Sequence, residues 1–321
     1  MSKLDLNNFG QHFINEDFEA IYKATSTEFQ QMLGLNEFQH VCHAFNEGVH
    51  HYEKFLEKQW FDTIQVVWID QNKEKGIQFV YDQNEVIIGL YLKPFVTYAS
   101  DHKMTKNNYR LPICDEWFVF WGGANEFENY HYVYENQRYA YDLVRVKNDT
   151  TFEGTNLVNE NYYAFGTDVV APLHGKIVKV MDGLKDNVPG ETDEQHPAGN
   201  YVIIEHPHKE YSMIAHFKKD SIVVKEGEFV KEGQLLGKCG NSGNSSEAHI
   251  HFQVMDRPQF EKAKSIRIQF QNHREPVQGD TVVPLPLDKK NMDNFDKVEN
   301  SLTFTDIVMT VPKIIGQYFK G

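Results

Sequence analysis

The sequence has few cysteines and more acidic than basic side chains. Its three cysteines, Cys42, Cys114 and Cys239, are odd in number and far apart in the 321-residue chain. This argues against a disulfide framework and against a cysteine-based zinc cluster. The 46 acidic residues outnumber the 32 basic ones and give a formal net charge of −14. A nucleic-acid binder, which needs clustered lysine and arginine, is therefore not expected.

Long apolar runs are also missing, although a membrane span needs about 20 consecutive apolar residues. The longest candidates, residues 63–69 and 86–92, have the length of strands, so no membrane span is expected. The N-terminus, MSKLDLNNFGQHF, lacks a basic start followed by an apolar stretch and so shows no secretory signal. The prediction is a cytoplasmic protein, or an extracellular or cell-wall protein that is exported by another route.

The length favours two domains at roughly 150 residues per domain. In the first part, apolar residues at intervals of three and four predict helices over 18–29 and 36–48. Short β-rich runs then predict an antiparallel meander over residues 63–69, 76–81 and 86–92. We therefore expect an N-terminal α+β domain.

Residues 8–95 resemble the small NTF2/cystatin-like domains that precede catalytic modules, notably in the segment GLYLKP at 89–94. The resemblance implies a cone-shaped α+β domain over this range. Its histidines, with no accompanying carboxylate arrangement, are expected to be solvated rather than to bind a metal. No chemistry is assigned to this part of the chain.

Residues 105–256 consist of strand and turn patterns, which predict a mainly antiparallel all-β domain. The segments VVAPLHGKIVKV (169–180) and VKEGEFVKEGQLLG (224–237) place glycines where tight turns join short strands. Residues 257–321 are predicted to be a C-terminal extension with additional β structure that packs on this domain.

The pattern with most chemical meaning is His249-Ile250-His251, which follows a loop rich in glycine and serine. In a strand His249 and His251 share one face, while Ile250 and Phe252 point into the core. One imidazole can bind a metal ion while its neighbour handles a proton. His216, at the end of an apolar strand, is a further candidate for stabilising charge at a reacting carbonyl.

The ordered segments APLHGKI, GNYVIIEH, YSMIAHF, VKEGQLLG and GNSGNSSEAHIHF resemble the M23 family of zinc metallopeptidases, of the lysostaphin and LytM type, over residues 129–256. The resemblance implies a β-rich fold related to the barrel-sandwich and duplicated hybrid motif folds. It also implies hydrolysis of peptidoglycan peptide cross-links with Zn²⁺. By this resemblance His251 binds the metal, and His216 and His249 flank the reacting water as catalytic residues.

The other two metal ligands of the family come from a His-x-x-x-Asp segment before a strand that here reads GTDVVAP (166–172). The residue four before Asp168 is Ala164, which cannot bind a metal ion, so Asp168 is a poor candidate. A better source is HYVYENQRYAYDL (131–143), in which Arg138 replaces the histidine of the family and Asp142 matches its aspartate. Arginine stays protonated and cannot be a ligand.

Hairpin geometry offers His131 as the missing imidazole. If Asn136 and Gln137 form a two-residue turn, residue 131 pairs with residue 142, with Cβ atoms about 5 Å apart. Both side chains could then reach one zinc ion with bonds of about 2.0–2.2 Å. The expected metal site is His131, Asp142 and His251 with a fourth position open, and a site of Asp142 and His251 alone stays the alternative.

Other histidines are assigned no role. His206-Pro207-His208 is also a His-x-His pattern, but Pro207 removes a ladder donor, so this segment is predicted to be a loop. His174 and His196 are expected to face solvent.

The predicted function is zinc-dependent hydrolysis of a peptide or peptidoglycan substrate, and two other functions remain open. Arg138 in place of histidine would suit a degenerate peptidase that binds peptide or glycan without cutting it. His216 and His249 could instead serve a histidine phosphocarrier of a related β fold, which needs no metal. Zinc content separates the phosphocarrier from the other two, and turnover separates the hydrolase from the binding module.

Overall fold

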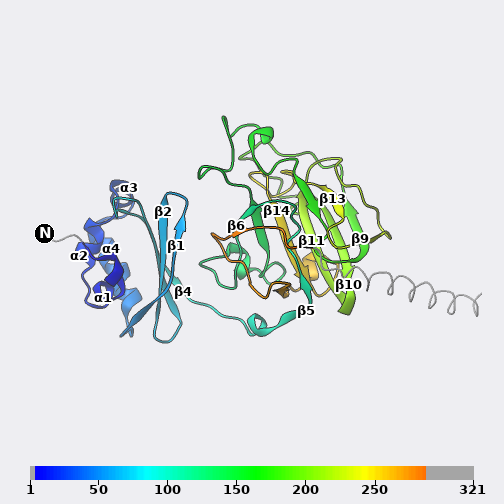
Figure 1. The fold of residues 1–321 in the computed structure, drawn as a ribbon. Coiled ribbons are helices and arrows are strands. Elements are labelled where there is room, and N and C mark those ends of the chain that lie inside the picture. The colour runs from blue at the N-terminus through cyan, green and yellow to red at the C-terminus, as the bar shows by residue number, and fades with distance from the viewer. Residues whose placement is uncertain (1–3, 287–321) are drawn as a thin grey trace, which may run out of the picture.

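The computed structural model describes residues 4–286, which form a smaller α+β body and a larger β-rich body (Figure 1). A mainly antiparallel β protein with an N-terminal helical region was predicted, and this fold class is confirmed. No helix within residues 4–286 is long and apolar enough to cross a membrane.

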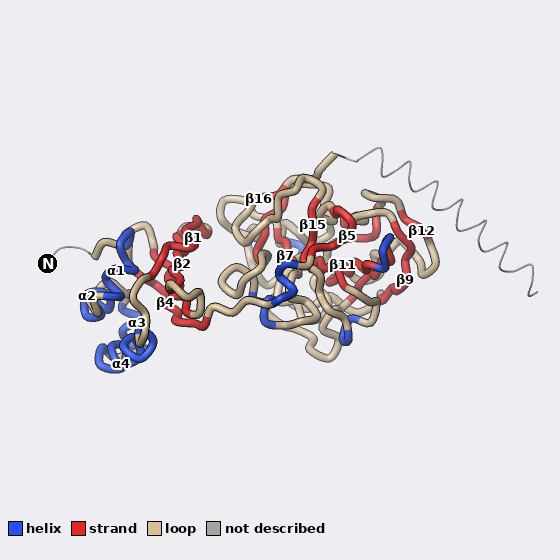
Figure 2. Tube along the Cα trace, turned by 90° about the horizontal axis from the view of Figure 1, so that it is seen from below, coloured by secondary structure: helices blue, strands red, loops and turns tan. Residues whose placement is uncertain are grey.

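The N-terminal body places four short helices on one side of a four-stranded sheet (Figure 2). The sheet is antiparallel in the order β1-β2-β3-β4. Phenylalanines of the helices, such as Phe9 and Phe18, pack with Phe79 of the sheet in one buried cluster. The elements are η1 (Leu6–Asn8), α1 (Phe9–Ile14), α2 (Phe18–Lys23), α3 (Thr27–Met32), α4 (Leu35–Asn46), β1 (Tyr52–Trp60), β2 (Thr63–Asp70), β3 (Lys75–Tyr81) and β4 (Ile87–Pro94).

The predicted meander is confirmed, but the single helix predicted over 18–29 is wrong. The chain breaks between α2 and α3, where the Ser26 hydroxyl accepts a hydrogen bond from the Phe29 amide at 3.2 Å and caps a new helix. The Ser26 amide in turn donates to the Ile87 carbonyl at 2.8 Å. Helix capping and contact with the sheet therefore override the apolar periodicity. The NTF2/cystatin-like resemblance stays a prediction.

The β-rich body is built on an eight-stranded sheet in the order β12-β9-β10-β11-β14-β7-β6-β16. Two two-stranded sheets, β13-β8 and β15-β5, complete it. Its strands are β5 (Met104–Tyr109), β6 (Trp117–Trp121), β7 (Tyr141–Val144), β8 (Asp168–Val170), β9 (Gly175–Met181), β10 (Asn200–His206), β11 (Glu210–Phe217), β12 (Phe229–Val230), β13 (Leu235–Lys238), β14 (Ile250–Met255), β15 (Arg267–Phe270) and β16 (Thr281–Val282). Its 3₁₀ turns are η2 (Ala99–His102), η3 (Tyr130–Val133), η4 (Asn159–Asn161), η5 (Pro207–Lys209) and η6 (Phe260–Lys262).

The central strands β10, β11 and β14 are buried on both faces. Val202, Ile214 and Phe252 point into the main core, whereas Ile203 and Met213 point into a smaller cluster on the other face. A strand with two buried faces reads as a continuous apolar run rather than an alternating one. This burial explains why the segments YVIIEH and YSMIAHF are so apolar.

The chain after β14 returns to the same body. β15 pairs in parallel with β5, and β16 pairs with β6 at the edge of the large sheet. The domain limits 8–95, 105–256 and 257–321 stay a prediction, and residues 287–321 of the expected extension lie outside the described residues.

Candidate metal and catalytic site

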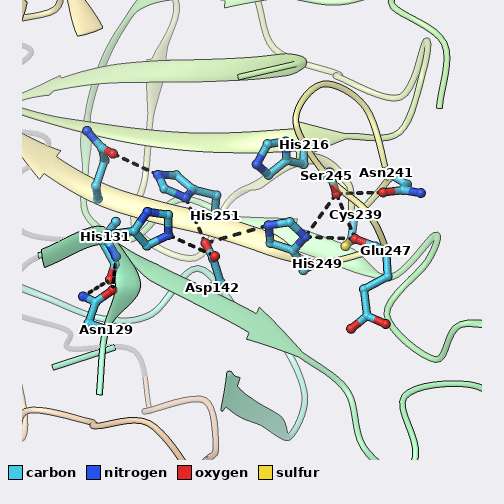
Figure 3. A network of polar contacts seen from close by, with 12 residues as sticks. Asn129, His131, Asp142, His216, Cys239, Asn241, Ser245, Glu247, His249 and His251 are labelled. Carbon is cyan, nitrogen blue, oxygen red and sulfur yellow. Dashed lines mark hydrogen bonds and ion pairs between the residues drawn. The ribbon is translucent and has the colours of Figure 1, made fainter. Parts of the chain in front are cut away.

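Three neighbouring strands bring most of the expected site residues together (Figure 3). Asp142 on β7 and His251 on β14 are direct partners in the strand register. On the other side of β14, His251 pairs with Ala215 of β11, so His216 at the end of β11 lies close by. His249 stands just before β14, with its Nε2 3.8 Å from Asp142 Oδ1. The prediction that Ile250 and Phe252 point into the core is confirmed.

His131 also reaches Asp142, but the hairpin that was expected to bring it there is wrong. β7 is already paired with β14 on one edge and with β6 on the other, so no edge remains for residues 131–135. Instead His131 lies in η3, whose start is capped by Asn129: the His131 amide donates to Asn129 Oδ1 at 3.1 Å. The Asn129 side-chain amide donates to the Ala140 carbonyl at 3.0 Å and so ties η3 to the start of β7.

The cluster of His131, Asp142 and His251 has the composition of a metal site. His131 Nε2 lies 2.9 Å from Asp142 Oδ2, and His251 Nδ1 lies 2.9 Å from Asp142 Oδ1. One donor atom from each residue falls within 4.8 Å of the others. All three are buried, with 2–5% of their surface exposed. Two imidazoles and one carboxylate form a three-ligand set of the kind found in catalytic zinc sites.

Gln253 sets the tautomer of His251 and thereby prepares it for a metal ion. The Gln253 side-chain amide donates to the Asn136 carbonyl at 2.9 Å, which turns its oxygen toward His251 Nε2, also at 2.9 Å. In the neutral ring, Nε2 therefore carries the proton and Nδ1 keeps its lone pair. That lone pair faces a carboxylate oxygen of Asp142. Because both atoms are acceptors, a cation bound between them would be a ligand partner for both.

The charges of the cluster fit the same interpretation. Burial alone would raise the pKa of Asp142, but the neighbouring imidazoles of His131 and His249 hold that pKa well below its usual value. Burial lowers the pKa of His131, and its Nδ1 has no hydrogen-bond partner among the described residues. Burial also opposes protonation of His251, but its hydrogen bond to Asp142 raises its pKa. A metal ion would compete with that proton, since ligands must be deprotonated to bind.

His216 and His249 face the cluster as candidate proton acceptors. Nδ1 of His216 donates to the Ser242 carbonyl at 2.7 Å, and Nδ1 of His249 donates to the Glu247 carbonyl at 2.9 Å. These bonds leave Nε2 of each neutral ring with its lone pair. The ring centroids of His216 and His249 are 4.6 Å apart. Burial, followed by the proximity of the other histidines, lowers the pKa of His216 well below its usual value.

His216 also has an unusual backbone conformation. Its φ of +66° lies in the left-handed region, which is uncommon for residues other than glycine, although histidine enters it more often than most. The Gly240 amide donates to the His216 carbonyl at 2.9 Å and holds this bend at the end of β11. Such strain is concentrated at functional sites, and here it turns the imidazole out of the strand and toward His249.

The two residues that the sequence analysis rejected as ligands, Asp168 and Arg138, lie outside the cluster. Asp168 on β8 forms an ion pair with Lys238 on the surface. The Arg138 guanidinium stacks 3.4 Å from the ring centre of Tyr98, and its Nε donates to the Tyr132 carbonyl at 3.0 Å. Arg138 therefore supports η3 from behind and does not enter the cluster.

The structure corrects the expectations for two other histidines. His206 is not a loop residue but ends β10 and is buried, with its Nδ1 donating to the His174 carbonyl at 2.8 Å. Its Nε2 accepts a hydrogen bond from the Ser212 hydroxyl at 2.7 Å. His174, expected to face solvent, is 9% exposed. Burial lowers the pKa of His206 to about 3, which keeps it neutral as a core residue.

The sequence interpretation missed the residues that orient the ligands, namely Gln253 and Asn129. Gln253 lies two positions after His251 on the same strand face, and strand alternation alone could have suggested it. Asn129 gave no comparable signal, because its partners at residues 131 and 140 are brought together by tertiary structure.

An open groove of about 740 Å³ runs beside Asp142 and His249. Glu247 lines it, and its carboxylate accepts a hydrogen bond from the Thr151 hydroxyl at 3.1 Å. Burial raises the pKa of Glu247. The groove therefore opens onto Asp142 and His249.

Comparison with known proteins supports the same family. Residues 161–263 match the model of Peptidase family M23, which covers His216, His249 and His251 but begins downstream of His131 and Asp142. The peptidoglycan DD-endopeptidases ShyB and ShyA of Vibrio cholerae are 36% and 33% identical over 93 residues, which is 29% of this chain and 20% of each relative. The chain thus spans about a fifth of the length of these curated relatives.

Similar solved structures include the catalytic domain of lysostaphin from Staphylococcus simulans. It is 25% identical, covers 36% of this chain and 88% of its own, and has a TM-score of 0.24. A zinc-containing peptidase from Vibrio cholerae is 16% identical, covers 69% of this chain and 57% of its own, and has a TM-score of 0.26. On the sequence match, residues 161–263 of this chain are similar to peptidase family M23.

Proposed function

We propose that the protein is a zinc-dependent endopeptidase that cleaves peptide links of peptidoglycan. The observation that carries this proposal is the convergence of His131, Asp142 and His251. Both oxygens of one buried carboxylate face imidazole nitrogens at 2.9 Å, and Gln253 leaves the His251 nitrogen free to bind a metal. These are the residues that would hold the ion.

Zinc in such a site supplies a Lewis acid that activates water and polarises a carbonyl oxygen. The residues of the chain supply the proton chemistry. His249 and His216 present unprotonated Nε2 atoms toward the cluster, while their Nδ1–H groups are held by backbone carbonyls. We assign to one the removal of a proton from the attacking water, and to the other, in the form that carries a proton on Nε2, the donation of a hydrogen bond to the negatively charged carbonyl oxygen.

The relatives support the choice of substrate, because ShyA and ShyB are named as peptidoglycan DD-endopeptidases. We extend that substrate to this chain as part of the proposal. Peptidoglycan as a substrate requires contact with the cell wall, so the relatives give no support to the cytoplasmic location expected from the N-terminus. We therefore place the activity in the cell wall or periplasm.

The phosphocarrier alternative fits the site poorly. A phosphorylated His249 would place a dianion beside Asp142, whose carboxylate is buried and 3.8 Å from His249 Nε2. Like charges at this distance in a buried site are strongly unfavourable. The degenerate peptidase remains the second candidate, although His131 supplies an imidazole in place of the one lost at Arg138.

The first test measures zinc by mass spectrometry in the purified full chain and in three variants. The wild type and Asp168→Ala are expected to hold about one zinc per chain, because Asp168 lies outside the cluster. His131→Ala and Asp142→Ala are expected to lose it. Retention of full zinc in both ligand variants would contradict the assignment.

The second test measures turnover as soluble fragments released from purified peptidoglycan sacculi. The zinc-loaded wild type should release peptide-linked fragments, and His249→Ala should keep its zinc but release far fewer. A chain that binds zinc and sacculi yet releases no fragments would favour the degenerate binding module.

A further inference from the structure

The groove beside the cluster is built by both bodies of the protein. Phe61, at the turn between β1 and β2 of the N-terminal sheet, lines it together with Phe120, Trp121 and Tyr130 of the β-rich body. Phe61 also packs 5.4 Å from Phe118, measured between ring centroids. The N-terminal body therefore contributes directly to the surface that a substrate would meet.

Several polar contacts fix the N-terminal sheet in this position. The Lys58 ammonium donates to the Gln278 carbonyl at 2.7 Å and lies 3.6 Å from Glu128. The Gln65 side-chain amide donates to the Phe127 carbonyl at 3.1 Å. The Lys58 and Glu128 side chains are 12% and 9% exposed, so this contact is largely shielded from water. Phe61 is thus held at the groove by contacts between its own sheet and the β-rich body.

Phe61 occupies a strained backbone position. Its φ is +54°, in the left-handed region where a bulky aromatic residue is rare. Trp60 pairs with Thr63, so the turn has only two central residues, a setting that favours glycine and asparagine. A strained backbone conformation at a turn lowers stability, and such conformations cluster at functional sites. The position of Phe61 in the groove lining is consistent with such a functional role.

Asp142, Glu247 and His249 of the site line part of the groove together with Val144 and Asp149, and the other lining residues fall into two chemical sets. The aromatic set is Phe61, Phe120, Trp121, Tyr130 and Phe152, and the centroids of Trp121 and Tyr130 are 5.4 Å apart. The uncharged polar set consists of side chains that donate and accept hydrogen bonds: Thr150, Thr151, Thr192, Asn244 and Ser246. No lysine or arginine in the described part of the chain lines this groove.

This combination matches the two surfaces of a sugar ring. A pyranose ring presents flat C–H faces that pack on aromatic side chains through dispersion and weak C–H contacts. Its edge carries hydroxyl groups that bond to threonine, serine and asparagine side chains. A simple anion would call for lysine or arginine, which the groove does not offer.

We propose that this groove binds a sugar ring of the glycan strand that carries the scissile peptide, and that Phe61 is a specificity-determining residue supplied by the N-terminal body. The proposal rests on the proposed function for the presence of a glycan-linked substrate. It goes beyond that function because it gives the N-terminal body a part in choosing the substrate. It predicts that the protein prefers a peptide attached to sugar over the same peptide alone.

The binding test uses an N-acetylglucosamine tetrasaccharide, which contains no peptide bond to cleave. The zinc-loaded full chain is titrated with it, and binding is followed by calorimetry and by intrinsic tryptophan fluorescence, to which Trp121 in the groove contributes. Saturable binding is expected. Phe61→Gly and Trp121→Ala should each weaken it about threefold to tenfold, the range for loss of one aromatic contact.

Phe55→Ala is the matched control. Phe55 is an aromatic residue on β1 that is 43% exposed and packs 5.5 Å from Phe95, away from the groove. This variant should bind the tetrasaccharide as the wild type does. In Phe61→Gly the relief of left-handed strain offsets the lost packing on Phe118, so the melting temperature should stay close to that of the wild type. A lower melting temperature with unchanged sugar affinity would show a purely structural role and overturn the proposal.

A kinetic test separates this proposal from the proposed function. The ratio of kcat/KM for a disaccharide-linked peptide to that for the free peptide should exceed one in the wild type and fall toward one in Phe61→Gly. Hydrolysis with equal preference for both substrates and no tetrasaccharide binding would refute the sugar site alone. Tetrasaccharide binding in a chain that cleaves neither substrate would support the sugar site and contradict the endopeptidase.

Discussion

Gln253→Leu should weaken zinc binding without touching any ligand. Gln253 is fully buried and accepts the Nε2–H bond of His251. Leucine has a similar size but no acceptor, so the buried N–H of His251 would lose its partner, and the ring would lose its fixed tautomer and orientation. Changes of this kind usually reduce metal affinity about 10- to 100-fold, which corresponds to roughly 1.4–2.7 kcal/mol.

The assay is a competition titration of the full chain against a fluorescent zinc chelator at fixed pH. Gln65→Leu serves as the control, because Gln65 is also buried and also donates to a backbone carbonyl, but on the N-terminal sheet. The control should keep the zinc affinity of the wild type. Gln253→Glu restores an acceptor for His251 and should bind zinc more tightly than Gln253→Leu. An affinity for Gln253→Leu within twofold of the wild type would refute the argument that Gln253 prepares His251.

Three further predictions follow from other contacts. His249→Ala should lower kcat about 100- to 10,000-fold in the fragment-release assay, the usual range for loss of a general acid–base group, and an unchanged kcat would remove His249 from the mechanism. Asp101→Asn should lower the free energy of unfolding by about 1–3 kcal/mol in denaturant titrations, because the buried carboxylate accepts hydrogen bonds from Tyr132 at 2.7 Å and Tyr139 at 2.6 Å. His206, whose pKa is lowered by burial from 6.5 to about 3, binds a proton more readily in the unfolded chain, so its contribution to stability is complete above pH 6.5 and is lost as the pH falls toward 3. Between pH 7 and pH 5.5 the free energy of unfolding should therefore fall by about 1 kcal/mol more in the wild type than in His206→Gln. An equal fall in both proteins would contradict this prediction.

The part of the site that was predicted from sequence depends on local geometry. Strand alternation alone places His249 and His251 on one face and Ile250 in the core, and the structure shows this arrangement. The end of an apolar strand likewise located His216. Within one strand the side-chain period is fixed, so short-range patterns suffice.

The pairing of His131 with Asp142 was predicted for the wrong reason. The hairpin argument assumed that an edge of β7 was free, but β6 and β14 occupy both edges. Only the tertiary arrangement reveals this, because β14 lies more than a hundred residues away in the chain. The same contact arises instead from a capped 3₁₀ turn, which has no strong sequence pattern.

The N-terminal body shows the same division between local and long-range information. The β-rich runs predicted the meander, whereas the strand β1 was missed because its alternating residues are mostly polar or half-exposed. The role of Phe61 at the groove also escaped the sequence, since it depends on how the two bodies dock.

The most direct test of the account is an anomalous-scattering map of zinc-loaded crystals recorded on both sides of the zinc absorption edge. The account predicts one strong peak bonded to His131 Nε2, an Asp142 oxygen and His251 Nδ1, at about 2.0–2.2 Å from each. A fully zinc-loaded protein with no peak between these three side chains would contradict the central claim.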